Sequence, residues 1–114
     1  MNVPVIVNAK AVGSLGDFAA MPQEASNPIA RTRSADIAGT EGASVGVWEC
    51  EPGMFRRQIK GKEFCHFTQG HCFFIPDGQP AIEIHAGDSV YLPANCNGVW
   101  DVREALKKTY IIID

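Results

Sequence analysis

Hydrophobic and polar side chains alternate in short runs from Val45 to the end of the chain, and these runs are rich in β-branched and aromatic residues. A period of two is typical of strands with one buried face. Glycine, proline, asparagine and aspartate separate the runs, as in the hairpin signal Pro76-Asp77-Gly78. The pattern therefore predicts eight strands, over residues 45–51, 54–59, 63–69, 71–76, 81–85, 89–92, 98–103 and 106–113. Eight short strands with regular turns favour a double-sheet jelly roll or barrel.

The first 44 residues have a different texture, because alanine, glycine, serine and proline dominate there and show little periodicity. We expect one helical turn at residues 17–21 and a loop at residues 34–44. No helical period persists elsewhere. The sequence thus predicts one all-β domain over residues 45–114 and an irregular N-terminal arm over residues 1–44.

Composition and charge narrow the possible partners. The 114 residues are enough for one domain, and 46% hydrophobic with 20% charged residues excludes a disordered chain. A net charge of −3 argues against nucleic-acid and membrane partners, which require a basic surface. The four cysteines form no C-x-x-C pair and no apolar run reaches the length of a membrane span. We expect a cytoplasmic protein with reduced thiols.

Several motifs in the predicted domain indicate a family. Residues 63–70 follow the pattern E-x6-G and residues 87–93 follow G-x5-P, which resemble the skeletons of the two cupin motifs. Residues 46–56 (GVWECEPGMFR) and 100–104 (WDVRE) resemble the opening and closing strands of one small cupin family, described as ureidoglycine-aminohydrolase-like or ethanolamine-utilisation-like (the DUF861 type). The resemblance implies a double-stranded β-helix, the conical jelly roll of cupins, often a homodimer, with a cavity at the barrel mouth.

The resemblance does not carry a metal site to this chain. The common cupin site uses two His and one Glu of the first motif and one His of the second. Glu63 matches the Glu, but the paired His positions fall on Arg57 and Ile59, or on Arg56 and Gln58, and the last falls on Gly98. A lone carboxylate does not hold a transition metal. We therefore expect no metal and no other cofactor.

The three histidines do not restore the metal site. Alternation along the strand of Glu63 turns His66 to the opposite face. His71 follows the turn at Gly70, so we expect it at a loop or strand edge. His85 precedes the turn at Ala86-Gly87-Asp88, so we expect it to be exposed.

The same alternation selects the residues of the barrel interior. Glu63, Cys65 and Phe67 share one face, and Trp100 shares a face with Gly98. The expected interior residues are Trp48, Cys50, Glu63, Cys65, Phe67, Cys72, Phe74 and Trp100. The two tryptophans either fill the core or form an aromatic wall whose indole N–H groups orient a ligand.

Glu63 requires a cationic partner inside an aromatic barrel, because burial disfavours an unpaired carboxylate. Arg56 or Arg57, on the neighbouring strand, is the natural partner. The pair is either a structural ion pair or a site in which Glu63 acts as a base and the arginine binds an anion. We take Glu63 and Arg57 as candidate catalytic residues. Candidate ligand-binding residues are Trp48, Cys50, Arg56, Cys65, Phe67, Phe74 and Trp100.

These observations predict a small-molecule-binding cupin without the usual His-ligated metal. The ligand is expected to be small and polar or weakly anionic, and the resemblance points to nitrogenous metabolites such as amines, ureides and amino-acid derivatives. One alternative is a metal-dependent or acid–base enzyme acting on such a metabolite. Another is a non-catalytic interaction module. We also expect a homodimer in which the N-terminal arm covers an edge of the partner's sheet.

Overall fold

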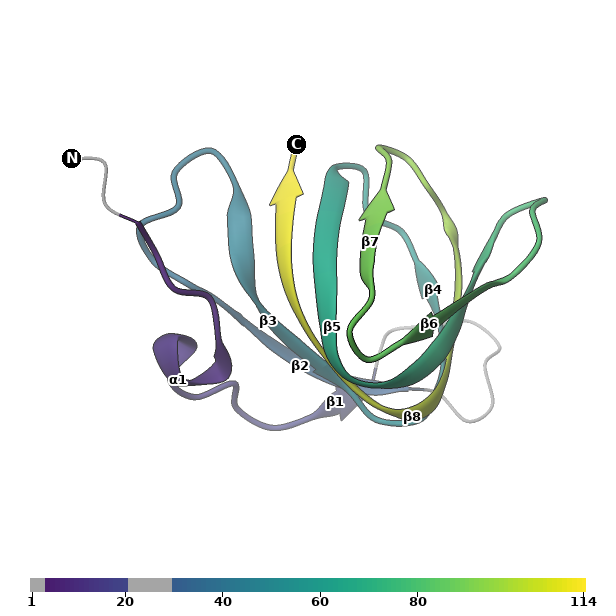
Figure 1. The fold of residues 1–114 in the computed structure, drawn as a ribbon, viewed down its shortest axis with the longest axis horizontal. Helices are drawn as coiled ribbons and strands as arrows, with labels where there is room; N and C mark the ends of the chain where they lie inside the picture. The colour runs from purple at the N-terminus through teal and green to yellow at the C-terminus, as the bar shows by residue number, and fades with distance from the viewer. Residues whose placement is uncertain (1–3, 21–29) are drawn as a thin grey trace.

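The computed structural model describes residues 4–20 and 30–114, and its strands curl into an open barrel (Figure 1). Within these two ranges, one short helix precedes eight strands. Their bounds are α1 Ala9–Val12, β1 Ala19–Ala20, β2 Arg31–Asp36, β3 Ser44–Cys50, β4 Gly53–Arg57, β5 Lys62–Pro76, β6 Ile82–His85, β7 Ser89–Leu92 and β8 Gly98–Ile113. All strand pairs are antiparallel, in the order β1-β2-β3-β8-β5-β6, with β4 also on β8 and β7 also on β5. The predicted jelly-roll class is confirmed.

Two long, bent strands, β5 and β8, pair with each other along most of their length and connect the other strands of the barrel. The first part of β5 pairs with β7 and its second part with β6, while β8 pairs first with β4 and then with β3. The strands predicted at 63–69 and 71–76 are therefore one strand, and those at 98–103 and 106–113 are another. Register shifts mark the bend between Phe67 and Cys72. Gly70 has a φ of 101° there and lies against the backbone of β8, so a punctuating glycine bends the strand instead of ending it.

The predicted alternation of faces is confirmed along β5. Glu63, Cys65 and Phe67 are buried, whereas Phe64 and His66 are exposed. The core joins this face to the inward faces of the other strands. Its main members are Cys50, Phe55, Cys65, Phe67, Cys72, Phe74, Ile84, Leu92, Trp100, Val102 and Leu106.

The N-terminal region is more ordered than its composition predicts. The loop expected at residues 34–44 is wrong at its start, since β2 extends to Asp36 and pairs with β3. The helical turn expected at residues 17–21 is also wrong, because Ala19–Ala20 is a strand; Met21 lies outside the described residues. β2 forms by pairing with the edge of β3, and β1 forms by pairing with β2. Such non-local pairing leaves no trace in the local sequence pattern.

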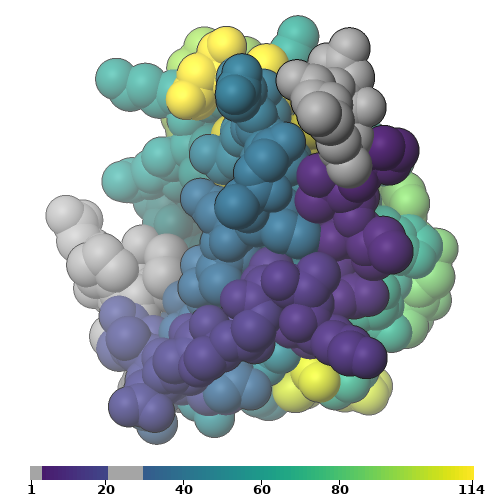
Figure 2. Space-filling view, turned by 90° about the vertical axis from the view of Figure 1, so that its left-hand side faces the viewer, coloured from purple at the N-terminus to yellow at the C-terminus, as the bar shows by residue number. Residues whose placement is uncertain are grey.

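Residues 4–20 run across the same side of the molecule as β2 (Figure 2). Two arginines of β2 hold them in place. Arg31 donates to the carbonyl of Phe18 at 3.1 Å, and Arg33 lies 4.3 Å from the centroid of the Phe18 ring. No helix in the described ranges is long and apolar enough to cross a membrane.

Candidate functional site

A cavity of about 430 Å³ opens at the mouth of the barrel. Strands β2, β3, β4, β5 and β8 all contribute side chains to it. Its wall is aromatic and its inner end is charged. The lining residues are Ser34, Asp36, Ser44, Trp48, Phe55, Arg56, Arg57, Gln58, Ile59, Glu63, Trp100, Lys108, Tyr110 and Ile112. A concave, mostly apolar site with a few convergent polar groups is the usual form of a small-molecule site.

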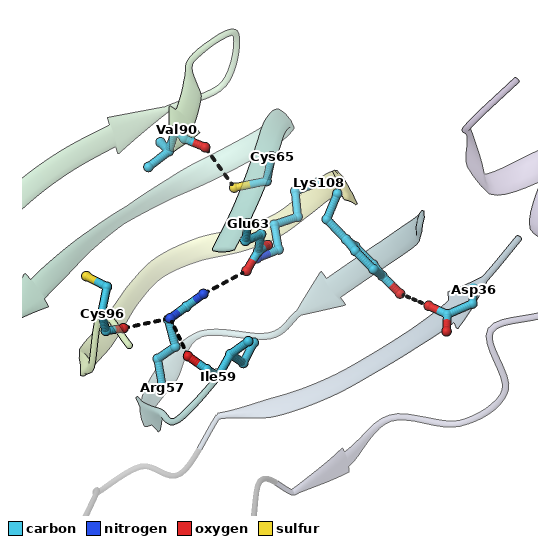
Figure 3. Close-up of polar contacts among 9 residues, drawn as sticks. Asp36, Arg57, Ile59, Glu63, Cys65, Val90, Cys96 and Lys108 are labelled. Carbon is cyan, nitrogen blue, oxygen red and sulfur yellow. Dashed lines mark hydrogen bonds and ion pairs between the residues drawn. The ribbon is translucent and has the colours of Figure 1, made fainter. Parts of the chain in front are cut away.

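Glu63 lies at the inner end of this cavity between two cations (Figure 3). Its side chain is only 1% exposed. Lys108 donates from Nζ to Oε2 at 2.7 Å, and Arg57 donates from Nη2 to Oε1 at 3.4 Å. A buried carboxylate is costly unless it is paired and hydrogen-bonded. Two cations on one carboxylate leave the inner end with one uncompensated positive charge.

The ammonium group of Lys108 is enclosed by aromatic rings. Its Nζ lies 4.7 Å from the centroid of the Trp48 ring, 5.2 Å from that of Trp100 and 5.8 Å from that of Phe67. The faces of aromatic rings carry negative electrostatic potential, so they stabilise a cation that has lost most of its water. The rings and Glu63 together hold the lysine side chain in one position.

Arg57 is fixed from the other side of the carboxylate (Figure 3). Its Nη1 donates to the carbonyl oxygen of Cys96 at 2.6 Å and to that of Ile59 at 3.3 Å. The buried Nε has no hydrogen-bond partner among the described residues. An unsatisfied buried donor is uncommon in native proteins, and it sets this arginine apart from the other buried polar side chains of the described residues.

The outer rim of the cavity carries a second polar pair. The hydroxyl of Tyr110 on β8 donates to Asp36 on β2. Burial and the neighbouring Asp36 carboxylate both raise the pKa of Tyr110, so the phenol stays protonated and can act as a donor. The end of β2, which lies in the segment expected to be a loop, thus contributes Asp36 to the rim.

The structure separates the sequence-predicted residues into three groups. Trp48, Arg57, Glu63 and Trp100 meet around the cavity, as one constellation. Arg56 also borders the cavity, but its guanidinium forms an ion pair with Asp77 on the outside. The remaining candidates lie in the core and do not line the cavity; they are Cys50, Cys65, Phe67 and Phe74.

Three of the cysteines are buried and none of the four is in a disulfide. Burial raises the pKa of Cys50 and Cys72 to about 12 and that of Cys65 to about 11. A thiol with a raised pKa is a poor nucleophile and a poor metal ligand near neutral pH. These cysteines therefore act as small apolar core residues.

Sequence reasoning missed three polar residues of the site, namely Lys108, Tyr110 and Asp36. A signal existed for two of them. Leu106 is apolar, so alternation along β8 places Lys108 and Tyr110 on the same inward face. No local signal existed for Asp36, because its position depends on the pairing of β2 with β3.

The donor set at Glu63 does not fit the His-rich metal centre common in cupins. No described residue that lines the cavity is a histidine or cysteine. Both carboxylate oxygens of Glu63 already receive cationic donors, from Lys108 and Arg57. The positive charges of Lys108 and Arg57 thus neutralise the Glu63 carboxylate, as a metal ion does in the common cupin site.

The position of the last cupin ligand has no room for a side chain. A Cβ atom built on Gly98 would lie 2.4 Å from the carbonyl oxygen of Ile75 and 2.8 Å from the ring of Phe74. We expect Gly98→Ala to lower the free energy of unfolding by about 1–3 kcal/mol through overpacking. Urea unfolding monitored by circular dichroism measures the change. Asn97→Ala, at an exposed neighbouring position, is the control; equal stability of the two variants would contradict the close approach.

An antiparallel jelly roll with this mouth cavity defines a cupin barrel, a class consistent with small-molecule binding. The chain belongs to the EutQ-like cupin domain family, whose sequence model matches residues 37–110. No curated protein matches the sequence.

Solved structures extend this likeness. A DUF861 family protein from Thermotoga maritima shares 25% identity at a TM-score of 0.57, over 59% of this chain and 76% of that one. The EutQ protein of Clostridium difficile shares 16% identity at a TM-score of 0.68, over 96% and 80%. A putative ethanolamine utilization protein Q from Salmonella typhimurium shares 12% identity at a TM-score of 0.65, over 89% and 98%. The two lower identities support the fold alone.

Proposed function

We propose that this protein binds a small, weakly anionic organic molecule in the barrel cavity, without a metal ion. The observation that carries the proposal is the inner end of the cavity, where Arg57 and Lys108 both face one carboxylate, Glu63. The residual positive charge of these buried side chains favours an anionic group on the ligand.

The polar atoms suggest how the ligand is oriented. Its anionic group approaches the cations of Lys108 and Arg57, which both line the cavity. Glu63 and the rim pair of Asp36 and Tyr110 can accept hydrogen bonds from ligand N–H groups. The rings of Trp48 and Trp100 provide an apolar wall for the rest of the molecule. Carboxylates that also carry nitrogen, such as amino-acid derivatives and ureides, match this combination.

An acid–base enzyme is a second candidate, and one contact favours it. The 2.7 Å hydrogen bond between Lys108 and Glu63 joins a proton donor and a proton acceptor that both line the cavity. Such a pair can move a proton to or from a bound molecule. Turnover of a ligand that the native protein binds, and its loss in Glu63→Gln, would support this candidate over simple binding.

A thermal-shift screen with carboxylates, ureides and amines tests the proposal; amines belong in it because two structural neighbours are described as EutQ or ethanolamine utilization proteins. We expect carboxylates to raise the melting temperature of the native protein. Calorimetric titration of Lys108→Met with the best of them should show at least a tenfold weaker affinity, since a charge-assisted hydrogen bond is worth about 1.5–3 kcal/mol.

Arg56→Gln is the matched control for this titration. Arg56 is also basic and borders the cavity, but its guanidinium is paired with Asp77 at the surface. Its replacement should change affinity by no more than about threefold. Stabilisation by amines alone, or equal affinity in Lys108→Met and the native protein, would refute an anionic ligand.

A further inference from the structure

A second cluster of metal-ligating side chains lies on the outer surface of the barrel. His71 of β5 and His85 of β6 are direct partners across the antiparallel ladder. Glu83 precedes His85 by two residues, so it lies on the same face of β6. None of the three lines the mouth cavity. His71, expected at a loop or strand edge, lies within β5 opposite His85.

The three side chains converge on one point. Nε2 of His71 lies 2.8 Å from Oε2 of Glu83, and Nε2 of His85 lies 3.3 Å from the same oxygen. In a tetrahedral zinc site with bonds of about 2.0–2.2 Å, neighbouring ligand atoms are about 3.4 Å apart. Small side-chain adjustments therefore suffice to place all three atoms around one ion.

The surrounding structure orients the two imidazoles before any ion binds. The rings stack with centroids 4.7 Å apart and planes inclined by 17°. The edge of Phe73 packs against His71, with centroids 5.3 Å apart. Four register pairs join β5 and β6 around the cluster and fix the strands that carry it. The nitrogen lone pairs lie in the ring planes, so the two stacked rings must rotate toward one another to share an ion, while the paired strands limit the backbone entropy lost on binding.

The cluster is also open to solvent on one side. The side chain of His71 is 22% exposed, whereas those of Glu83 and His85 are 49% and 60% exposed. An ion can enter from this side and keep a water molecule in its fourth position. Within residues 4–20 and 30–114, this is the group of three or more His, Cys, Asp or Glu side chains whose ligand atoms come close enough for one metal.

We propose that His71, Glu83 and His85 form a surface site for a divalent transition metal of the zinc, cobalt, nickel or copper class. Two imidazoles and one carboxylate are ligands that suit these ions, and they do not suit magnesium or calcium, which prefer oxygen alone. The site joins β5 to β6 and is separate from the proposed ligand cavity. Its test is therefore independent of that proposal.

Titration of the untagged, metal-free full chain with Co²⁺ tests the site, because bound cobalt absorbs visible light according to its ligands. We expect saturation at one equivalent, and Zn²⁺ should displace the cobalt and remove the absorption. His85→Gln and Glu83→Gln should each weaken binding at least tenfold, since each removes one of three protein ligands. Both positions are exposed, and circular dichroism verifies that the variants fold.

His66→Gln is the matched control. His66 is the one histidine of the chain outside the cluster, and it lies on the same strand as His71. Its Nδ1 forms a 2.8 Å hydrogen bond with the hydroxyl of Ser89. This variant should bind cobalt as the native protein does. The proposal is overturned if cobalt does not saturate at a defined stoichiometry, or if His66→Gln loses as much affinity as His85→Gln. Zn²⁺ should also raise the melting temperature of the native protein and of His66→Gln, but not that of His85→Gln.

Discussion

Replacing Lys108 with methionine is expected to lower the free energy of unfolding by about 3–5 kcal/mol, the usual cost of removing one partner of a buried ion pair. The methionine fills much of the same volume, so the loss is chiefly electrostatic. Glu63, whose side chain is only 1% exposed, loses the 2.7 Å hydrogen bond and keeps only the longer, 3.4 Å contact with Arg57. Urea unfolding at neutral pH, monitored by tryptophan fluorescence, measures the change.

Two further variants make this prediction specific. Lys107→Met alters the neighbouring, exposed lysine of β8 and should change stability by no more than about 0.5 kcal/mol. The double variant Glu63→Gln with Lys108→Met should cost less than the sum of the two single changes, because the cost arises from an unpaired charge. Additive costs, or equal stability of the two lysine variants, would show that the Glu63–Lys108 contact contributes little.

Replacing Trp100 with alanine is expected to lower the free energy of unfolding of the otherwise native protein by about 3–5 kcal/mol. The indole is buried at the centre of an aromatic cluster, with ring centroids 4.7 Å from Phe74, 6.0 Å from Phe67 and 6.4 Å from Phe55. Its removal leaves a void that the surrounding strands cannot fill, and it takes one ring away from Lys108. Thermal and urea unfolding measure the loss.

Phe64→Ala is the control for this truncation. Phe64 is also aromatic and lies in a central strand, but it is 51% exposed on the outer face. We expect its loss to cost about 1–2 kcal/mol, clearly less than Trp100→Ala, because only about half of the removed surface was buried. Similar costs for Trp100→Ala and Phe64→Ala would contradict the assignment of inner and outer faces.

The candidate site was predictable from the sequence only as far as strand periodicity reaches. Alternation places Glu63 and Trp100 inside the barrel without knowledge of any partner strand. Alternation left Arg56 and Arg57 as alternative partners of Glu63, because the inward face of a strand depends on where the strand begins. The β4–β8 register, which pairs Arg57 with Gly98, turns Arg57 inward. Similarly, the turn at Pro76-Asp77-Gly78 was recognisable because its signal is local.

Lys108 illustrates what local patterns cannot supply. It is separated from Glu63 by 45 positions, and the register of β5 and β8 pairs Lys108 with Phe67 instead. The lysine side chain is long enough to reach the carboxylate of a residue that is not its register partner, and it extends beside the rings of Trp48 and Trp100. The outer cluster follows the same rule, since His71 and His85 meet only through the β5–β6 ladder.

Strand periodicity and the family motifs are encoded in neighbouring positions, so the all-β class, the family and the inward-facing residues can be predicted without a structure. Which charges meet depends on the folded arrangement of the strands. It brought Arg57 and Lys108 to Glu63, paired Asp36 with Tyr110, and placed two histidines and a glutamate together on the outer surface. The physical reason is that strand register and bulges, which arise from non-local pairing, set the distances between side chains far apart in the chain.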